Sequence, residues 1–313
     1  MAPGVLIAAE LRDLLDPGPV PGASVTWLPA DSATPAGGYA AIVPLLSRRV
    51  GPAELAGMPR LRIVANCAVG VDNVDLAACA ARGVVVTNTP DVLTDATADL
   101  TMALLLAAAR RLKEGQDLVH SGEWAGWDPR QLLGLELRGA VLGIVGAGRI
   151  GQAVARRAHA FGMRLCYTAH SPKPTLELET GALFLPLDDL LARSDVVTLH
   201  VPSGPETRRL IDVRALARMR KGAILINTAR GDVVDEAALV TALMSGQLAA
   251  VGLDVFAREP HVPDELIEHP RAFVLPHLGS ATVRTRRAMA NLAVRNVRAL
   301  LSGEPLLSPV VAP

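Results

Sequence analysis

Short runs of apolar residues alternate with amphipathic stretches along almost the whole chain. The runs are too short to be helices and are rich in Val, Ile and Leu, which is typical of strands buried on both faces of a parallel sheet. We expect two series of strands, at Val5–Ala8, Val25–Leu28, Ala41–Leu45, Arg62–Ala65 and Val84–Thr87, and at Val141–Val145, Arg164–Thr168, Val196–His200, Ile224–Asn227, Ala249–Leu253 and Phe273–Leu275. Strands that alternate with helical stretches predict an α/β fold built from βα repeats.

The longest helical pattern lies between the two series of strands and predicts one helix from Asp95 to about His120. Thr94 or Asp95 can cap its start, and Gly115 can interrupt its far end. A loop that contains Gly and Trp follows this helix, from Ser121 to Gly134.

A second long helix is expected from Thr282 to about Leu301, where Gly303 and Pro305 form a stop signal. Because this helix follows the last strand, it can return the chain to the first domain. A chain of 313 residues is longer than one hydrophobic core usually accommodates. We therefore predict two domains of doubly wound parallel sheet, joined by two crossings of the chain.

Composition and charge argue against several classes of protein. Hydrophobic residues make up 50% of the chain and charged residues 20%, which is typical of a globular protein. The 31 basic and 31 acidic side chains balance, so no nucleic-acid or membrane partner is expected. No segment has the ~20 uninterrupted apolar residues of a membrane span, and the N-terminus lacks the pattern of a secretory signal.

The cysteines bear on location and on metal chemistry. Cys67, Cys79 and Cys166 are an odd number in no metal-ligand spacing. We expect them to be buried apolar side chains, and we expect no metal site. Together with the missing signal, this usage favours a cytosolic (cytoplasmic) protein.

The sharpest local motif follows the predicted strand at Val141–Val145 and has the pattern G-x-G-x-x-G. Gly146 permits a tight turn, Gly148 lets the backbone approach a pyrophosphate, and Gly151 allows a helix to pack closely on the strand. An Ala-rich helix to about Phe161 follows, as a dinucleotide-binding motif requires, and a purely structural glycine turn is the alternative. We assign these residues to cofactor binding: Gly146, Ala147, Gly148, Arg149, Ile150 and Gly151.

The end of the next strand bears on which dinucleotide is bound. NAD-preferring sites usually carry an acidic residue there, and none follows the strand at Arg164–Thr168. His170, Ser171 and Lys173, next to Ala169, are instead donors suited to a 2′-phosphate. We predict that NADP(H) is preferred and that NAD(H) can also bind. The alternative is a solvated turn with relaxed cofactor choice.

Three further motifs follow predicted strands, at the carboxyl ends where open α/β sheets bind ligands. They are Ile226–Gly231, Gly252–Phe256 with the nearby Glu259, and Pro276–Thr282. Side chains from all three can therefore meet at one edge of a sheet.

The three motifs carry complementary side chains. Arg230 offers a planar fork that can hold a substrate carboxylate. His277 can give a proton to a developing alkoxide as a hydride arrives. Glu259 can bond the other imidazole nitrogen and fix its tautomer. Each residue alone is more often structural or solvated, but together they suit reduction of a 2-oxo acid.

In this order, the motifs resemble the D-2-hydroxyacid dehydrogenase family. They read GAGRIG, HVPSGPET, NTARG, GLDVF followed by EP, and PHLGSAT, and Ala68–Asp72 matches the family's substrate loop. The family has two Rossmann-like domains, and its substrate domain is built from both chain ends. The resemblance implies a flavodoxin-like substrate-binding domain at 1–96 plus 284–313 and a dinucleotide-binding Rossmann domain at 97–283.

Carried over residue by residue, the resemblance implies a catalytic set of Arg230, Glu259 and His277. The backbone amides of Val69 and Gly70 would bind the substrate carboxylate, together with Arg230, and Asp254 would bond the nicotinamide carboxamide. The other cofactor contacts that the resemblance implies are Thr97, His200, Val201, Pro202, Thr207, Thr228, Ala229, Arg230, His277 and Gly279.

Within the family, the chain most resembles the NADPH-using glyoxylate and hydroxypyruvate reductases. Gly122–Trp124 and Trp127–Pro129 resemble a loop of those enzymes, although the intervening segment is shorter here. A Trp of that loop reaches the substrate pocket of the partner subunit, so the resemblance implies a homodimer in which Trp127 contributes to substrate binding. The alternative is that Trp127 only anchors its own loop.

Other functions remain open on the same motifs. Dehydrogenases that act on phosphoglycerate, 2-ketogluconate, phosphite or formate share the scaffold, and so do dinucleotide-sensing corepressors that retain the catalytic residues. We favour an enzyme that reduces glyoxylate or hydroxypyruvate to the D-2-hydroxy acid, and turnover separates it from a sensor.

Overall fold

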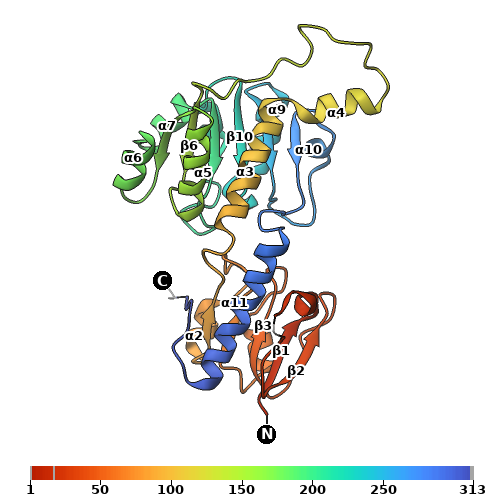
Figure 1. The fold of residues 1–313 in the computed structure, drawn as a ribbon, viewed down its shortest axis with the longest axis vertical. Coiled ribbons are helices and arrows are strands. Elements are labelled where there is room, and N and C mark those ends of the chain that lie inside the picture. Colours follow the sequence, from red (N-terminus) through yellow and green to blue (C-terminus); the bar gives the residue numbers. More distant parts are fainter. Residues whose placement is uncertain (1, 17, 311–313) are drawn as a thin grey trace. The chain divides into compact units, whose positions relative to one another are not determined.

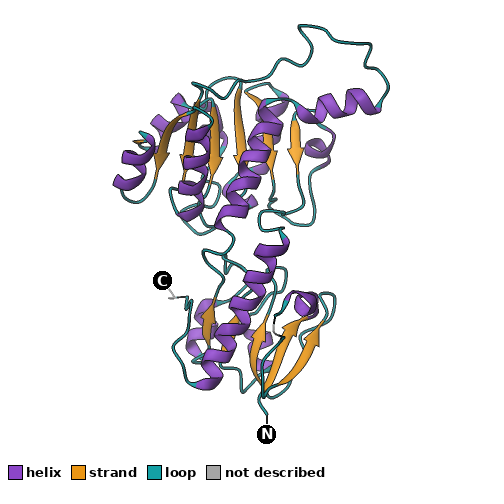
Figure 2. Cartoon of the chain, in the orientation of Figure 1, coloured by secondary structure: helices purple, strands orange, loops and turns teal. Residues whose placement is uncertain are grey.

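The computed structural model describes residues 2–16 and 18–310, which form two compact units (Figure 1). The first unit comprises the described parts of 1–93 and 280–313, and the second comprises 94–279. Each unit has its own parallel sheet with helices beside it (Figure 2). The chain is therefore an α/β protein with two Rossmann-like domains, as predicted.

The first unit has a five-stranded sheet in which every pairing is parallel. In sheet order its strands are β2 (Ser24–Leu28), β1 (Gly4–Ala8), β3 (Tyr39–Val43), β4 (Ile63–Ala65) and β5 (Val85–Thr87). Its helices are the 3-10 helix η1 (Ala9–Leu14), α1 (Pro52–Gly57), α2 (Leu76–Ala81) and α11 (Val283–Ser302). Leu6, Ile42 and Val64 are fully buried in its core, as the apolar runs of their strands predict.

The last helix, α11, and the residues after it belong to the first unit. Thr282 caps the helix by accepting a hydrogen bond from the Thr285 amide, and Gly303 ends it in the left-handed conformation. The helix packs on β4 and β3. Beyond it, the Val310 amide donates to the Val86 carbonyl at 2.8 Å. Residues from both ends of the sequence therefore build this unit.

The second unit has a seven-stranded sheet whose pairings are also all parallel. In sheet order its strands are β12 (Ala272–Val274), β11 (Leu248–Leu253), β10 (Ala223–Asn227), β9 (Val196–Leu199), β6 (Val141–Val145), β7 (Arg164–Thr168) and β8 (Leu183–Phe184). Its helices are α3 (Thr94–Ala109), α4 (Leu112–His120), α5 (Arg149–Ala160), α6 (Pro174–Thr180), α7 (Leu187–Arg193), α8 (Val213–Arg218), the 3-10 helix η2 (Gly231–Val233), α9 (Glu236–Met244) and α10 (Asp264–Glu268). From β6 the chain builds the sheet first in one direction, through β7 and β8, and then in the other, from β9 to β12. Such a reversal creates a crevice at the carboxyl edge of the sheet.

Separate apolar layers cover the two faces of this sheet. Leu142 and Ile144 of β6 belong to the layer that includes Leu105 of α3. The neighbouring Val145 belongs to the opposite layer, with Leu216 of α8. Adjacent residues of one strand thus enter different layers, which explains why the strand is an unbroken apolar run.

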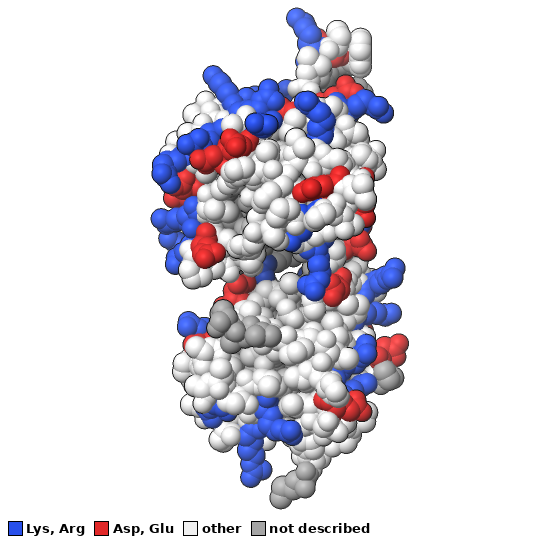
Figure 3. All heavy atoms as spheres, turned by 90° about the vertical axis from the view of Figure 1, so that its left-hand side faces the viewer, with Lys and Arg blue, Asp and Glu red and all other residues white. Residues whose placement is uncertain are grey.

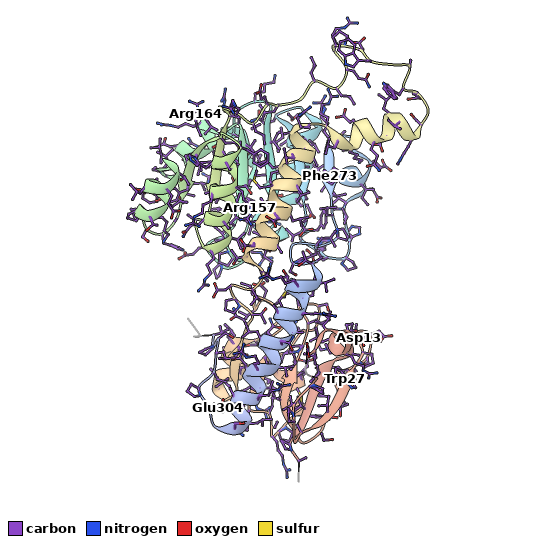
Figure 4. All side chains as sticks on the ribbon, viewed as in Figure 1. Asp13, Trp27, Arg157, Arg164, Phe273 and Glu304 are labelled. Carbon is purple, nitrogen blue, oxygen red and sulfur yellow. The ribbon has the colours of Figure 1, made fainter. Side chains whose placement is uncertain are left out.

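Ion pairs join α3 to α5 on one face of the sheet. Arg157 of α5, labelled in Figure 4, donates to Asp99 at 2.7 Å and to Asp95 at 3.0 Å. Both acidic residues lie in the first turns of α3, where negative charge also suits the helix dipole. The pairs hold the start of α3 against the helix that follows the glycine-rich loop.

The helix predicted from Asp95 to about His120 is in fact two helices. α3 ends at Ala109, and α4 begins directly after Arg111, which has the left-handed conformation (φ 54°). The Leu135 amide donates to the Ala109 carbonyl at 2.8 Å and so satisfies a group freed where α3 ends. Gly115 lies inside α4, so the expectation that it interrupts the helix was wrong. The two-residue strand β8 was not predicted.

The surface and the cysteines agree with the composition. Acidic and basic side chains occur on both units in Figure 3, in keeping with the zero formal charge. The three cysteines are free and buried, as predicted. Among residues 2–16 and 18–310, no helix combines the length and the apolar character that a membrane span requires.

Candidate active site

The strands of the second unit run parallel, so the loops after them lie at one edge of the sheet. Residues predicted to be functional follow six of these strands: Gly146 after β6, Ala169 after β7, His200 after β9, Thr228 after β10, Asp254 after β11 and His277 after β12. Since carboxyl ends of parallel strands form ligand sites, this edge is the candidate active site of the unit.

His277 and Glu259 form a hydrogen-bonded pair at this edge. His277 Nδ1 lies 2.8 Å from Glu259 Oε2, and the two side chains are 31% and 35% exposed. The other carboxylate oxygen, Oε1, accepts a hydrogen bond from the Phe256 amide at 3.1 Å. Burial opposes ionisation of Glu259, but the hydrogen bond and charge of His277 prevail and lower the pKa of Glu259. Glu259 is therefore held as a carboxylate that orients the imidazole.

Asp254 supports the backbone that carries His277. It is fully buried, and its two carboxylate oxygens accept hydrogen bonds from the Leu278 and Gly279 amides at 2.6 Å and 2.8 Å. Burial raises the pKa of Asp254, and the two amides oppose that rise. The His277 amide donates to the Asp254 carbonyl at 2.9 Å. These bonds hold His277 in the left-handed conformation (φ 55°), which a residue with a side chain rarely adopts.

Arg230 stands on a loop that Asn227 fixes. The Asn227 side chain donates to the Arg230 carbonyl at 2.8 Å and accepts from the Ala229 amide at 3.0 Å. The next residue, Gly231, packs so closely against the Phe256 backbone that a Cβ would overlap it. The loop that carries Arg230 and the loop that leads to Glu259 are thereby pressed together, and the charge of Arg230 helps to lower the pKa of Glu259.

The three glycines after β6 serve different purposes. Gly146 has a φ of 99°, and a Cβ there would lie 2.6 Å from the His200 carbonyl oxygen. A Cβ on Gly151 would overlap the Gly146 carbonyl oxygen. Gly148 differs, because its φ is −74° and a Cβ would meet nothing within 4 Å. Packing within the chain does not require a glycine at 148.

The open space at Gly148 fits a dinucleotide. Gly148 is the N-cap of α5, whose first amides and positive dipole end attract a phosphate. The missing side chain leaves room for a ligand to approach the backbone closely. The residues present therefore suit the pyrophosphate of a nicotinamide dinucleotide.

The turn after β7 is ordered by Tyr167. The Tyr167 hydroxyl accepts a hydrogen bond from the Lys173 amide and donates to Glu177 Oε1, each at 2.5 Å. The Lys173 ammonium donates to the Ser171 hydroxyl at 3.2 Å, and His170 is exposed beside them. The structure thus gathers the three predicted donors on one exposed turn, with no carboxylate in the turn itself.

The loop after β9 carries the predicted adenosine-side residues. The His200 amide donates to the Val145 carbonyl at 2.7 Å, and Thr198 Oγ1 lies 3.0 Å from His200 Nε2. Burial lowers the pKa of His200 to about 3, so the imidazole is neutral. Val201 and Pro202 follow, and the Thr207 hydroxyl donates to the Pro202 carbonyl at 2.6 Å.

A chain of threonine hydroxyls lies behind the site. Thr97 Oγ1 donates to the Gly279 carbonyl at 3.1 Å, and Thr101 Oγ1 donates to the Thr97 carbonyl at 2.8 Å. Thr101 Oγ1 also lies 2.8 Å from Thr228 Oγ1. The sequence indicated Thr97 and Thr228 but not Thr101, since a threonine inside an apolar helix carries no motif of its own. Asn227 lies in the NTARG motif, but the sequence assigned it no role of its own.

Three predicted substrate residues lie on segments other than the loops after these strands. Val69 and Gly70 belong to the first unit, where their carbonyls accept hydrogen bonds from Asn88 and Asn66, each at 2.8 Å. Trp127 belongs to the long loop after α4, and its side chain is 84% exposed. Within the described residues of this chain, Trp127 is therefore not an anchor buried against its own unit.

Sequence comparison relates the chain to known enzymes. Residues 102–279 match the family described as D-isomer specific 2-hydroxyacid dehydrogenase, NAD binding domain. The glyoxylate reductase of Thermococcus kodakarensis is 51% identical over 268 residues, which are 84% of this chain and 80% of that protein. The glyoxylate reductase of Aeropyrum pernix is 48% identical over 269 residues, with the same coverage of 84% and 80%.

Solved structures with similar folds hold either dinucleotide. The NADPH-dependent glyoxylate/hydroxypyruvate reductase of Sinorhizobium meliloti, in complex with NADP and malonate, has a TM-score of 0.89 and 36% identity, and covers 99% of this chain and 97% of that one. The D-lactate dehydrogenase of Aquifex aeolicus, with NAD and lactic acid, has a TM-score of 0.86 and 27% identity, and covers 99% of each chain.

Proposed function

We propose that this chain, which belongs to the D-isomer specific 2-hydroxyacid dehydrogenase family, reduces a small 2-oxo acid to the D-2-hydroxy acid with a nicotinamide dinucleotide. The substrate class that we propose is glyoxylate and hydroxypyruvate. It rests on the similarity to glyoxylate reductases and to a glyoxylate/hydroxypyruvate reductase. It also rests on the edge of the sheet that carries the imidazole of His277, the carboxylate of Glu259 and the guanidinium of Arg230.

The observation that carries the proposal is the 2.8 Å bond between His277 Nδ1 and Glu259 Oε2. It leaves Nε2 as the imidazole nitrogen that can face a substrate, and the carboxylate stabilises the charged ring. The dinucleotide, when bound, supplies the hydride for the carbonyl carbon. His277 gives its proton to the carbonyl oxygen as negative charge develops there, and Arg230 holds the substrate carboxylate through its planar fork.

The direct test is dinucleotide oxidation with glyoxylate, hydroxypyruvate, pyruvate and 2-ketogluconate, measured with NADPH and NADH in parallel. Fastest turnover with glyoxylate or hydroxypyruvate supports the substrate class. Fastest turnover with 2-ketogluconate moves the chain to another branch of the family. Tight dinucleotide binding without any turnover contradicts the enzyme and favours a sensor.

The finer cofactor assignment is NADP(H) over NAD(H). Lys173, Ser171 and His170 offer donors on one exposed turn, and the turn holds no carboxylate to repel a 2′-phosphate. Lys173→Glu places a negative charge in the turn, so it should weaken NADPH far more than NADH. Equal loss for both dinucleotides, measured as Kd, would contradict the assignment.

Three further assignments concern residues outside the cluster. We infer a homodimer, because Trp127 and the apolar Trp124 and Leu133 of the same loop are exposed. We keep Val69 and Gly70 as the amides that bind the substrate carboxylate and Trp127 as a substrate contact in the dimer. Sedimentation of the wild-type chain and of Trp127→Ala tests the assembly, and a monomeric wild-type chain would contradict it.

A cytosolic location stays a prediction.

A further inference from the structure

The second unit has a pocket at its amino edge, where the strands of its sheet begin. The pocket has a volume of about 340 Å³ and lies among Ala109 at the end of α3, Asp195 just before β9, Ala223 at the start of β10 and Arg271 just before β12. All strands of this sheet run parallel, so the catalytic loops lie at the other end of the same strands. The pocket is therefore separate from the catalytic edge of the unit, and its volume suits a small organic ligand.

The polar lining of the pocket is mostly cationic. Four basic side chains and one carboxylate line it: Arg111, Arg220, Lys221, Arg271 and Asp195. The carboxylate is already neutralised, because Asp195 Oδ1 accepts from Arg220 at 2.5 Å and Oδ2 accepts from the Val141 amide at 2.8 Å. Basic side chains also gather at the upper end of the second unit in Figure 3, and Figure 4 labels one of them, Arg164 at the start of β7. An anion that enters the pocket therefore meets an excess of positive charge.

Two of the four basic side chains have no partner within the described part of the chain. Arg111 forms a bidentate pair with Glu114, with nitrogen–oxygen distances of 2.8 Å and 2.6 Å, and Arg220 is held by its own ion pair. Lys221 and Arg271 are exposed, and neither side chain forms an ion pair or a hydrogen bond with any residue that the structure describes. Their two charges are therefore available to a ligand.

The groups beside Arg271 report a positive potential on this side of the pocket. The Lys113 ammonium donates to the His269 carbonyl at 2.9 Å, which fixes its charge next to the imidazole residue. Burial lowers the pKa of His269, and the charges of Arg271 and Lys113 lower it further. The Glu114 carboxylate opposes these effects but does not prevail. A negative charge bound at Arg271 would stabilise the imidazolium and raise the pKa of His269.

The floor of the pocket is apolar. Ala109, Leu135, Ile224 and Ala250 line it, and the Leu135 amide donates to the Ala109 carbonyl at 2.8 Å. A bare inorganic ion makes no use of such a floor, whereas the carbon atoms of an organic ligand bury apolar area against it. A guanidinium and an ammonium together match the charge of a phosphate monoester, which is about −1.5 to −2 at pH 7.

We propose that the pocket at the amino edge is a second ligand site, which binds a phosphate monoester of a small organic molecule. Lys221 and Arg271 hold the phosphate, and the organic part lies on the apolar floor. The site goes beyond the proposed function, because it uses neither the dinucleotide nor a 2-oxo acid. It binds its ligand without making or breaking a covalent bond.

The test is calorimetry with glycerol 3-phosphate on the full chain saturated with NADPH, at constant ionic strength. NADPH is assigned to the catalytic edge, so saturation removes the phosphate-binding groups of that edge as a competing site. The variants are Lys221→Gln and Arg271→Gln. Arg193→Gln is the matched control, because Arg193 is an exposed cation at the end of α7, on the same edge, and does not line the pocket. Each variant changes an exposed side chain, and its melting curve verifies the fold.

Glycerol 3-phosphate should bind to the wild-type chain in the presence of NADPH. One charge-assisted hydrogen bond corresponds to roughly tenfold to hundredfold in affinity, so Lys221→Gln and Arg271→Gln should each raise the Kd by about that factor. Arg193→Gln should leave the Kd unchanged. The pKa of His269, followed by NMR, should rise when the ligand binds. Inorganic phosphate should bind more weakly, because it makes no use of the apolar floor.

No binding of glycerol 3-phosphate would overturn the proposal, and so would an equal loss in all three variants, which indicates a diffuse attraction to the basic edge. A constant pKa of His269, or displacement of the ligand by NADPH, would place the ligand elsewhere and overturn it as well. Inorganic phosphate that binds as tightly as glycerol 3-phosphate would refute the organic part of the ligand. Failure of NADPH to bind would contradict the proposed function alone, and the same variants then test the pocket without NADPH.

Discussion

Gly148→Ala separates a glycine that the fold needs from one that a ligand needs. Gly148 has a φ of −74° and a ψ of −166°, which alanine adopts without strain, and its Cβ would meet nothing within 4 Å. Alanine gains about 0.4–1 kcal/mol from the unfolded state and loses roughly 0.5 kcal/mol or more as an N-cap. The free energy of unfolding should therefore change by less than about 1 kcal/mol.

Binding should respond far more strongly than stability. If the pyrophosphate binds as assigned, the new methyl group would occupy the space through which it approaches the first amides of α5. Loss of one charge-assisted hydrogen bond costs about 1.5–3 kcal/mol, which raises the Kd of the dinucleotide by roughly tenfold to a hundredfold. Calorimetry with NADPH gives the Kd, and denaturant unfolding gives the stability.

Two further alanine variants are the controls. Gly51 is also an extended N-cap glycine, in the first unit. Its Cβ would meet two side-chain atoms at ordinary contact distances, Glu54 Oε2 at 3.5 Å and Arg49 Nε at 3.7 Å, so Gly51→Ala should change neither property. Gly151→Ala overlaps the Gly146 carbonyl and should lower stability by about 1–3 kcal/mol. A Kd for Gly148→Ala within twofold of the wild-type value would refute the pyrophosphate assignment.

The remaining predictions concern the acid, its partner and a neutral histidine. His277→Ala should lower kcat by ~10² to 10⁴ while the chain still binds NADPH, and unchanged kcat would remove His277 from proton transfer. Glu259→Gln should lower kcat, because the imidazolium loses its counter-charge and the ring loses the carboxylate that orients it, and an unchanged kcat would contradict that role. In the wild type the pKa of Glu259 is lowered, so its ion pair with His277 should persist as the pH falls, until Glu259 itself takes up a proton. His200 has a folded pKa of about 3 against 6.5, so the unfolded chain takes up a proton first as the pH falls. Stability should drop by up to ~1.4 kcal/mol per pH unit within that window. His200→Gln should flatten the drop in urea titrations, and an equal slope in both chains would contradict the neutral imidazole.

The sequence predicted the fold best where a strand is covered by helices on both faces of the sheet. β6 is apolar at every position except Gly143 because helices cover both faces of the sheet, so its bounds were predicted without error. The order of the glycines and of the loops after β10, β11 and β12 also follows from the ligand edge of a parallel sheet. The family motif placed His277, Glu259 and Arg230 in sequence, and the hydrogen bond joins the first two in space.

The features that were missed depend on contacts made by distant residues. Arg111 takes a left-handed conformation that no residue type signals, where the Leu135 amide meets the end of α3. The strand β8 has two residues and no pattern to detect. The hydrogen bond from the Leu278 amide to Asp254 could not be predicted either, because it depends on the pairing of β11 with β12.

The first unit is closed by residues from the far end of the sequence, and this affects how the protein folds during synthesis. Residues 94–279 are contiguous, so the second unit can fold as soon as they leave the ribosome. The five-stranded sheet must wait for α11, which packs on β3 and β4, and for Val310, which bonds to Val86. During that interval the apolar residues of β3 and β4 that α11 covers are exposed, and exposed apolar strands are prone to aggregate. A stop codon before α11 should therefore give an aggregation-prone N-terminal segment attached to a unit that still binds dinucleotide.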